Sequence, residues 1–167
     1  MSALTSIYSI NYKTIQLLEV GTCVGYSTCW LFKGILEGNT KGSILTIEIN
    51  EQRFKQALSN ITKLGQIGGF ESAPEKIQII HGDALEELNK INESIDVVFL
   101  DAIKEDYLHY VELIKSKLKF GGILTAHNVI SHNYLMEDFL EELSNNERWN
   151  TVLIPTSSGM ALSIKKF

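Results

Sequence analysis

Residues 17–28, which read L-L-E-V-G-T-C-V-G-Y-S-T, constrain this chain more than any other stretch. An apolar run ends in an acid and a glycine, a second glycine follows, and an amphipathic segment with a hydroxyl in its first turn comes next. This order predicts a strand, a tight loop and a helix. Such a junction aims the first N–H groups of the helix, and the positive end of its dipole, at the space above the sheet. The stretch is therefore a place to hold a small ligand.

The same alternation of strand and helix patterns continues along the chain. Short apolar or β-branched runs predict strands at residues 14–20, 43–49, 76–81, 94–101 and 123–126, and a closing hairpin at 151–154 and 160–164. Helical spacing of apolar residues predicts helices at 26–36, 51–64, 84–91, 105–118 and 134–143, with a long loop at 65–75. We expect an α/β fold with a doubly wound, mostly parallel seven-stranded sheet of the Rossmann-like type and an antiparallel C-terminal hairpin.

Length and charge limit the class of protein. The 167 residues suit one domain, 1–167, with a short N-terminal extension at about 1–13. The net charge of −5 and the absence of a Lys/Arg run argue against a nucleic-acid partner. No apolar run approaches the roughly 18 residues of a membrane span, and the first residues do not resemble a secretion signal. We expect a cytoplasmic protein without a membrane partner, in which Cys23 and Cys29 are reduced.

Polar residues recur where the predicted strands end, and ligands of doubly wound sheets bind at that edge. They are Glu19, Gly21, Glu48, Asp83, Asp101, His127 and Asn128. Glu48 is positioned to accept hydrogen bonds from both hydroxyls of a ribose. The loop lacks the third glycine of the dinucleotide fingerprint, and Cys23 stands where the second would be. A ligand with a ribose but no pyrophosphate fits best, although the glycines could simply form a tight turn and Asp83 could simply cap a helix.

Six motifs extend this interpretation over about residues 16–165. They are L-L-E-V-G-T-C-V-G-Y-S-T, L-T-I-E-I-N, I-I-H-G-D-A, V-V-F-L-D-A-I-K-E-D-Y, G-G-I-L-T-A-H-N-V and G-M-A-L-S-I-K. With these motifs in this order, the chain resembles the S-adenosylmethionine-dependent O-methyltransferases of the catechol and caffeoyl-coenzyme A type. The resemblance implies an enzyme that moves a methyl group from S-adenosylmethionine to an oxygen of a small-molecule acceptor.

The resemblance also implies which residues bind the cofactor. The loop and Ser27 would cradle the methionine part, Glu48 would hold the ribose, and Asp83 and Ala84 would border the adenine with Ile49 on its other face. The full set of expected cofactor residues is Glu19, Gly21, Thr22, Cys23, Gly25, Ser27, Glu48, Ile49, Gly82, Asp83, Ala84 and Asp101. An acidic edge suits a cofactor that carries a sulfonium and an ammonium.

For catalysis, the resemblance implies Asp101 as a metal ligand and Lys104 as general base. The family's remaining ligands are an Asp-Asn pair, whereas here the pair is His127-Asn128. A divalent metal on Asp101, His127 and Asn128 would be magnesium or a softer ion, because an imidazole suits softer metals. His127 could also act as a general base without a metal, or only fill the position. Lys104 could equally be a solvated surface lysine.

The second departure from the family is the short segment before the first strand, where relatives carry helices that cover the active site. The acceptor could bind an open cleft, a homodimer partner could supply the cover, or the sequence could be truncated. Two other functions remain open at this point: a catalytically impaired S-adenosylmethionine-binding protein and a nicotinamide-dependent oxidoreductase.

Overall fold

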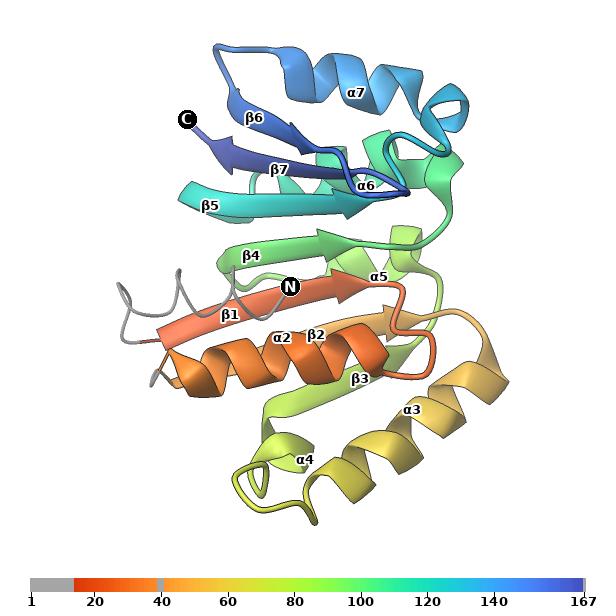
Figure 1. Cartoon of the computed structure of the whole chain (residues 1–167), viewed down its shortest axis with the longest axis vertical. Coiled ribbons are helices and arrows are strands. Elements are labelled where there is room, and N and C mark those ends of the chain that lie inside the picture. The colour runs from red at the N-terminus through yellow and green to blue at the C-terminus, as the bar shows by residue number, and fades with distance from the viewer. Residues whose placement is uncertain (1–13, 39–40, 167) are drawn as a thin grey trace. The chain divides into compact units, whose positions relative to one another are not determined.

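The computed structural model describes residues 14–38 and 41–166 (Figure 1). The expected N-terminal extension at about 1–13 lies outside the described residues. The elements form two compact units, one ending at Ala84 and the other beginning at Leu85.

The first unit is a three-stranded parallel sheet with helices. Its strands β1 (Thr14–Val20), β2 (Lys41–Glu48) and β3 (Ile77–His81) lie in the order β3-β2-β1. Helix α2 (Tyr26–Glu37) packs along β2, as Figure 1 shows, and α3 (Glu51–Leu64) packs on β3. The sheet and α2 bury apolar side chains, among them Ile15, Leu31, Ile35 and Ile44, while Ile47 is buried on the other face of β2. The core thus holds the ends of β1 and β2 in place beside the loop that joins β1 to α2.

The second unit is a mixed sheet in the order β4-β5-β7-β6. Its strands are β4 (Ile95–Leu100), β5 (Leu118–His127), β6 (Trp149–Ile154) and β7 (Met160–Lys165). β4 and β5 are parallel, whereas β7 is antiparallel to both β5 and β6. Its helices are α6 (Tyr107–Ile114) and α7 (Glu137–Ser144), with short 3₁₀ turns η1 (Lys104–Asp106) and η2 (Asn133–Leu135), while α5 (Ala84–Lys90) begins at the last residue of the first unit.

The predicted fold class is confirmed. The described residues contain seven strands that alternate with helices, and three of the five strand pairs quoted above are parallel. The antiparallel C-terminal hairpin is present as β6 and β7. The helix predicted at 51–64 is α3, and Asn50 caps it by accepting a hydrogen bond from the Arg53 N–H.

Several predicted boundaries are wrong. The loop predicted at 65–75 contains the start of the short helix α4 (Ala73–Lys76), because Pro74 sits in its first turn, where its missing N–H costs nothing. The helix predicted at 105–118 ends at Ile114, and β5 begins at Leu118 instead of at residue 123. Gly121 adopts a φ of 71° inside β5, and the pairing register with β4 shifts there, which is the geometry of a β-bulge and not of a break.

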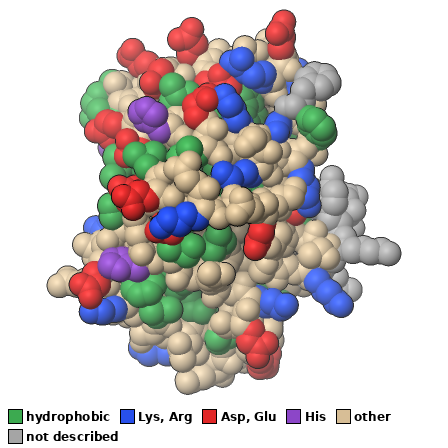
Figure 2. Space-filling view, turned by 180° about the vertical axis from the view of Figure 1, so that it is seen from behind, with side chains coloured by type: hydrophobic (Ala, Val, Ile, Leu, Met, Phe, Trp, Pro, Cys, Tyr) green, Lys and Arg blue, Asp and Glu red, His purple; other side chains and the backbone are tan. Residues whose placement is uncertain are grey.

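Two features of the described residues concern membranes and surface charge. None of the helices in the described part of the chain has the length and apolarity needed to cross a lipid bilayer. On the face shown in Figure 2, Lys and Arg side chains are scattered among Asp and Glu and do not gather into one basic patch.

Candidate functional site

The loop between β1 and α2 has an unusual backbone. Gly21, Cys23 and Gly25 all have positive φ values, of 100°, 51° and 86°. Gly25 is the N-cap residue of α2, no side chain caps this end of the helix, and its first turn contains no acidic residue. The N–H groups of that turn, with Ser27 among them, therefore remain open to the negative group of a ligand.

Glu48, at the end of β2, holds this loop in place. Its carboxylate is only 5% exposed, and it accepts the Cys23 N–H at 2.7 Å and the Asn50 N–H at 2.8 Å. The N–H groups of Gly21 and Thr22 donate to the Ile47 carbonyl at 3.0 and 3.2 Å. A carboxylate has about four acceptor positions, so Glu48 can hold the loop and still accept from the hydroxyls of a ribose.

A fully buried polar cluster lies beneath the loop. Glu19, Thr22, Thr28 and Thr46 are all 0% exposed. Thr28 and Thr46 donate to Glu19 Oε2 at 2.5 and 2.7 Å, and the hydroxyls of Thr22 and Thr46 are 2.6 Å apart. Burial, and then the charge of Glu19, raise the pKa of the neighbouring Cys29 thiol, which keeps that thiol protonated. Glu19, expected to bind the cofactor, thus supports the loop from below.

The residues expected near an adenine follow β2 and β3. These strands pair so that Glu48 lies opposite His81, which brings the segments after them together. Ile49 is 55% exposed, its carbonyl lies 3.2 Å from His81 Nε2, and the Gly82 N–H donates to the Glu48 carbonyl at 3.0 Å. Exposed Asp83 and buried Ala84 come next, at the start of α5. The first unit therefore brings together every expected cofactor residue except Asp101.

The backbone of the loop allows a direct test. We expect Gly25→Ala to lower the free energy of unfolding by about 1–2 kcal/mol, because φ is +86° although the nearest atom to an added Cβ would be 3.7 Å away. Gly68→Ala is the matched control, since nothing lies within 4 Å of an added Cβ there and φ is not in the left-handed range. Urea unfolding measures both, and equal losses would contradict the role given to the Gly25 conformation.

The second unit brings the three expected catalytic residues into contact. Asp101 follows β4, Lys104 begins η1, and His127 ends β5. Lys104 Nζ donates to Asp101 Oδ1 at 2.9 Å, and His127 Nδ1 lies 3.2 Å from Asp101 Oδ2. The side chains of Asp101 and His127 are 35% and 34% exposed, whereas that of Lys104 is 13% exposed. Lys104 is thus a paired, largely covered group and not the solvated surface lysine of the alternative interpretation.

Tyr107 belongs to the same cluster and was not singled out from the sequence. Its buried hydroxyl donates to the Leu100 carbonyl at 3.1 Å and accepts from Lys104 Nζ at 2.8 Å. Burial, followed by the charge of Asp101, raises the pKa of Tyr107 well above its usual range, so the hydroxyl stays neutral. The signal in the sequence was its spacing from Lys104, since residues three apart lie on one side of a helical turn.

The expected metal ligands do not form a set that suits magnesium. Among residues 14–38 and 41–166, no three His, Cys, Asp or Glu side chains are grouped so that they could hold a metal ion. Asp101, His127 and Asn128 offer one carboxylate, and the Lys104 ammonium lies 2.9 Å from one of its oxygens. Magnesium prefers several oxygen ligands in octahedral geometry, and a nearby ammonium opposes a second cation. His127 directs Nδ1 at Asp101, so the nitrogen that it could offer to a metal is Nε2.

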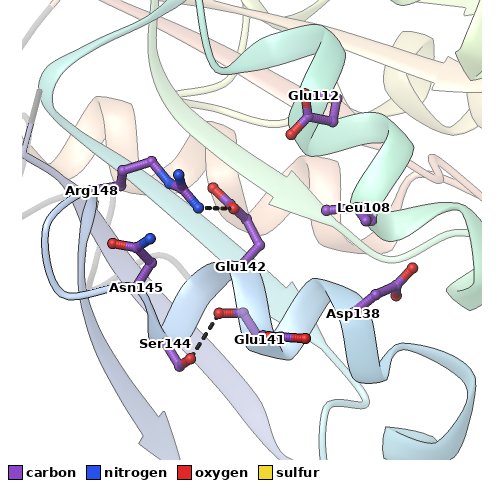
Figure 3. Close-up of a pocket in the computed structure, with 8 residues that line it drawn as sticks. All are labelled: Leu108, Glu112, Asp138, Glu141, Glu142, Ser144, Asn145 and Arg148. Atoms are coloured by element: carbon purple, nitrogen blue, oxygen red, sulfur yellow. Dashed lines mark hydrogen bonds and ion pairs between the residues drawn. The ribbon is translucent and has the colours of Figure 1, made fainter.

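An open hollow between α6 and α7 is separate from these groups (Figure 3). It has a volume of about 500 Å³ and is lined by Leu108, Glu112, Asp138, Glu141, Glu142, Ser144, Asn145 and Arg148. Arg148 forms an ion pair with Glu142, which also accepts a hydrogen bond from Trp149 Nε1 at 3.1 Å. No residue expected from the sequence to bind or react lines this hollow, so it is not the candidate site.

Known proteins resemble this chain in sequence and in structure. The model of a family described as "Methyltransferase domain" matches residues 18–129. Catechol O-methyltransferase of Mycobacterium tuberculosis is 28% identical over 116 residues, which are 69% of this chain and 48% of that protein. Caffeoyl-CoA O-methyltransferase of Zinnia elegans is 31% identical over 133 residues, 76% of this chain and 49% of that protein. These matches confirm the resemblance predicted from the six motifs.

Solved structures agree on the fold. The O-methyltransferase of Bacillus cereus in complex with SAH superposes with a TM-score of 0.81 at 24% identity, covering 99% of this chain and 78% of that one. An SAH-bound Podospora anserina methyltransferase gives a TM-score of 0.81 at 20% identity, with 99% and 78% coverage. The chain spans about half the length of the two curated relatives, at 48% and 49%.

Proposed function

Because this chain belongs to the methyltransferase domain family, we propose that it transfers the methyl group of S-adenosylmethionine to an oxygen of a small-molecule acceptor. The observation that carries the proposal is the loop at residues 21–25, held by Glu48 beneath an uncapped helix N-terminus. The names of the curated relatives, which specify O-methylation of catechol and caffeoyl-CoA, support an oxygen as the acceptor atom.

The cofactor assignment is supported by charge and by the solved relatives. S-adenosylmethionine supplies an electrophilic methyl group on a sulfonium, and a carboxylate edge stabilises positive charge better than a basic one. The O-methyltransferase of Bacillus cereus was solved with SAH, the product of such a transfer. In this chain the α2 N-terminus and Ser27 would bind the methionine carboxylate, and Glu48 would bind the ribose hydroxyls. Ile49, Asp83 and Ala84 would border the adenine.

For the chemical step, the contacts within the second unit support His127 as general base. Asp101 Oδ2 lies 3.2 Å from Nδ1 and would accept a hydrogen bond from it, which would leave Nε2 to accept a proton. The acceptor hydroxyl would give its proton to Nε2 while its oxygen bonds to the methyl carbon and the bond from that carbon to sulfur breaks. Lys104 would hold Asp101 in place, since its ammonium is engaged by Asp101 and Tyr107. This step needs no metal, and Asp101, His127 and Asn128 do not make a donor set that suits magnesium.

Methyl transfer to a panel of catechols and other phenols tests the proposal. The purified chain is incubated with S-adenosylmethionine and each phenol, and mass spectrometry detects a methylated product together with S-adenosylhomocysteine. Product formation is expected. Binding of S-adenosylhomocysteine in calorimetry without any transfer would favour a catalytically impaired binding protein. Binding of NADH without S-adenosylhomocysteine would favour an oxidoreductase.

Removal of divalent metals should leave the activity within about twofold of its starting value, because proton transfer to His127 needs no metal ion. The rate is measured before and after exhaustive dialysis against EDTA, and again after Mg²⁺ or Ni²⁺ is added back. A loss of activity that either ion restores would contradict the scheme and favour metal ligation by Asp101, His127 and Asn128.

A further inference from the structure

We propose that Thr46 is a positioning residue for cofactor binding, which acts through Glu19 and Thr22 on the loop that follows β1. Nothing in the six motifs assigned it a role, since a threonine in a strand interior is an ordinary β-branched residue. The inference rests on the proposed function, because the loop is positioned for a cofactor only if the chain binds one.

Strand register brings Thr46 to Glu19. β1 and β2 pair in parallel with Glu19 directly opposite Thr46, so their side chains lie next to each other on one face of the sheet. The Thr46 hydroxyl donates to Glu19 Oε2 at 2.7 Å, and Thr28 of α2 donates to the same oxygen at 2.5 Å. The Glu19 carboxylate thereby joins β1, β2 and α2 through two hydroxyl groups.

The single hydroxyl proton of Thr46 fixes the direction of the next bond. Because that proton goes to Glu19, the Thr46 oxygen can only accept from Thr22, and its separation from Thr22 Oγ1 is 2.6 Å. Thr22 is the second residue of the loop, so a chain of hydrogen bonds runs from Thr22 to Thr46 to Glu19. Chains of this kind, buried at 0% exposure, are strong and sensitive to the loss of any one member.

Thr46 and Glu48 together hold two successive loop residues. Residues two apart on a strand point to the same face, so both side chains reach towards the loop. Thr46 holds the side chain of Thr22, and Glu48 accepts the Cys23 N–H at 2.7 Å. Without the Thr46 hydroxyl, Thr22 would lose its fixed partner and the loop would lose one of its side-chain anchors, which also include Glu48 and the Asn60 amide that donates to the Val24 carbonyl at 2.8 Å. Such a loop would have to be ordered when the ligand binds, which lowers affinity.

The second unit contains a matched control for a purely structural role. Thr125 of β5 is 1% exposed, and its hydroxyl donates to the Val98 carbonyl at 3.1 Å. It shares with Thr46 the residue type, the burial and a side-chain hydrogen bond, but its hydrogen bond goes to β4 of its own unit. Thr46→Val and Thr125→Val therefore remove similar buried hydroxyl groups.

Calorimetric titration with S-adenosylhomocysteine, with steady-state kinetics, tests the inference. Thr46→Val should raise the Kd for S-adenosylhomocysteine and the KM for S-adenosylmethionine about tenfold or more, the size expected for a lost hydrogen bond to a charged group, while kcat at saturation stays within about twofold. Thr46→Ser should return the Kd to within about threefold of wild type, because it keeps the hydroxyl. Thr125→Val should leave the Kd within about twofold, although it lowers stability.

Several results would overturn the inference. Equal Kd values for wild type and Thr46→Val would do so. A rise of the Kd in Thr125→Val as large as that in Thr46→Val would also do so. If Thr46→Val does not fold, Thr22→Val replaces it, and an unchanged Kd in that variant has the same meaning. If wild type itself binds no S-adenosylhomocysteine, the proposed function is wrong, and so is the inference that rests on it. Binding by wild type with unaltered binding by the variants refutes the role of Thr46 alone.

Discussion

Replacing His127 by Gln should lower kcat by about 10²–10⁴-fold, the usual contribution of a general base. The side chain of His127 is 34% exposed, and its Nδ1 is oriented by Asp101 at 3.2 Å. Glutamine keeps a polar side chain of similar reach but cannot take up a proton at neutral pH. The Kd for S-adenosylhomocysteine should stay within about twofold, because none of the expected cofactor residues changes.

The measurement is steady-state methyl transfer at saturating S-adenosylmethionine, with calorimetric binding of S-adenosylhomocysteine on the same sample. His109→Gln is the matched control, since His109 is exposed on α6 and contacts neither Asp101 nor Lys104. A loss of less than about fivefold in His127→Gln would show that His127 only fills its position. Asp101→Asn should lose activity as well, because the amide has only one acceptor oxygen and no charge, and so cannot replace both carboxylate contacts, to His127 Nδ1 and to the Lys104 ammonium.

Much of the fold could be predicted because each strand carries its own local signal. The run from Thr14 to Val20 and the capped helix after Asn50 were placed correctly, since apolar spacing and N-cap chemistry act within a few residues. The start of β5 could not be predicted, because Gly121-Gly122 usually ends an element and here forms a bulge instead. Only pairing with β4 distinguishes these outcomes, and pairing is not a local property.

The candidate site also contains residues that could be predicted from the sequence and residues that could not. The positions of Glu48, Asp101 and His127 at the ends of strands could be predicted, because a parallel sheet gathers its polar residues at that edge, and their roles stay predictions. Thr46 and Tyr107 could not, since each looks like a core residue in sequence and differs only by where its hydroxyl points. Glu19 stays a predicted cofactor residue, and its 0% exposure and two hydroxyl donors show that it also supports the loop.

Glu48→Ala should weaken binding of S-adenosylhomocysteine by at least about 100-fold, equivalent to about 2.7 kcal/mol. Two effects add. The Cys23 and Asn50 N–H groups lose their acceptor, at 2.7 and 2.8 Å, and the ribose hydroxyls lose theirs. Hydrogen bonds to a charged group are each worth about 1.5–3 kcal/mol, so the loss of even two accounts for the expected change.

Glu48→Gln and Glu51→Ala separate these effects. Glutamine keeps one carbonyl oxygen as acceptor, so Glu48→Gln should bind with an affinity between those of wild type and Glu48→Ala. Glu51 lies three residues further on, is exposed, and forms an ion pair with Lys55 of its own helix, so Glu51→Ala should bind like wild type. Calorimetry measures the Kd values and urea unfolding checks that each variant folds. If folded Glu48→Ala binds S-adenosylhomocysteine with wild-type affinity, the ribose does not bind to the Glu48 carboxylate. The adenosyl group would then have to bind elsewhere on the chain.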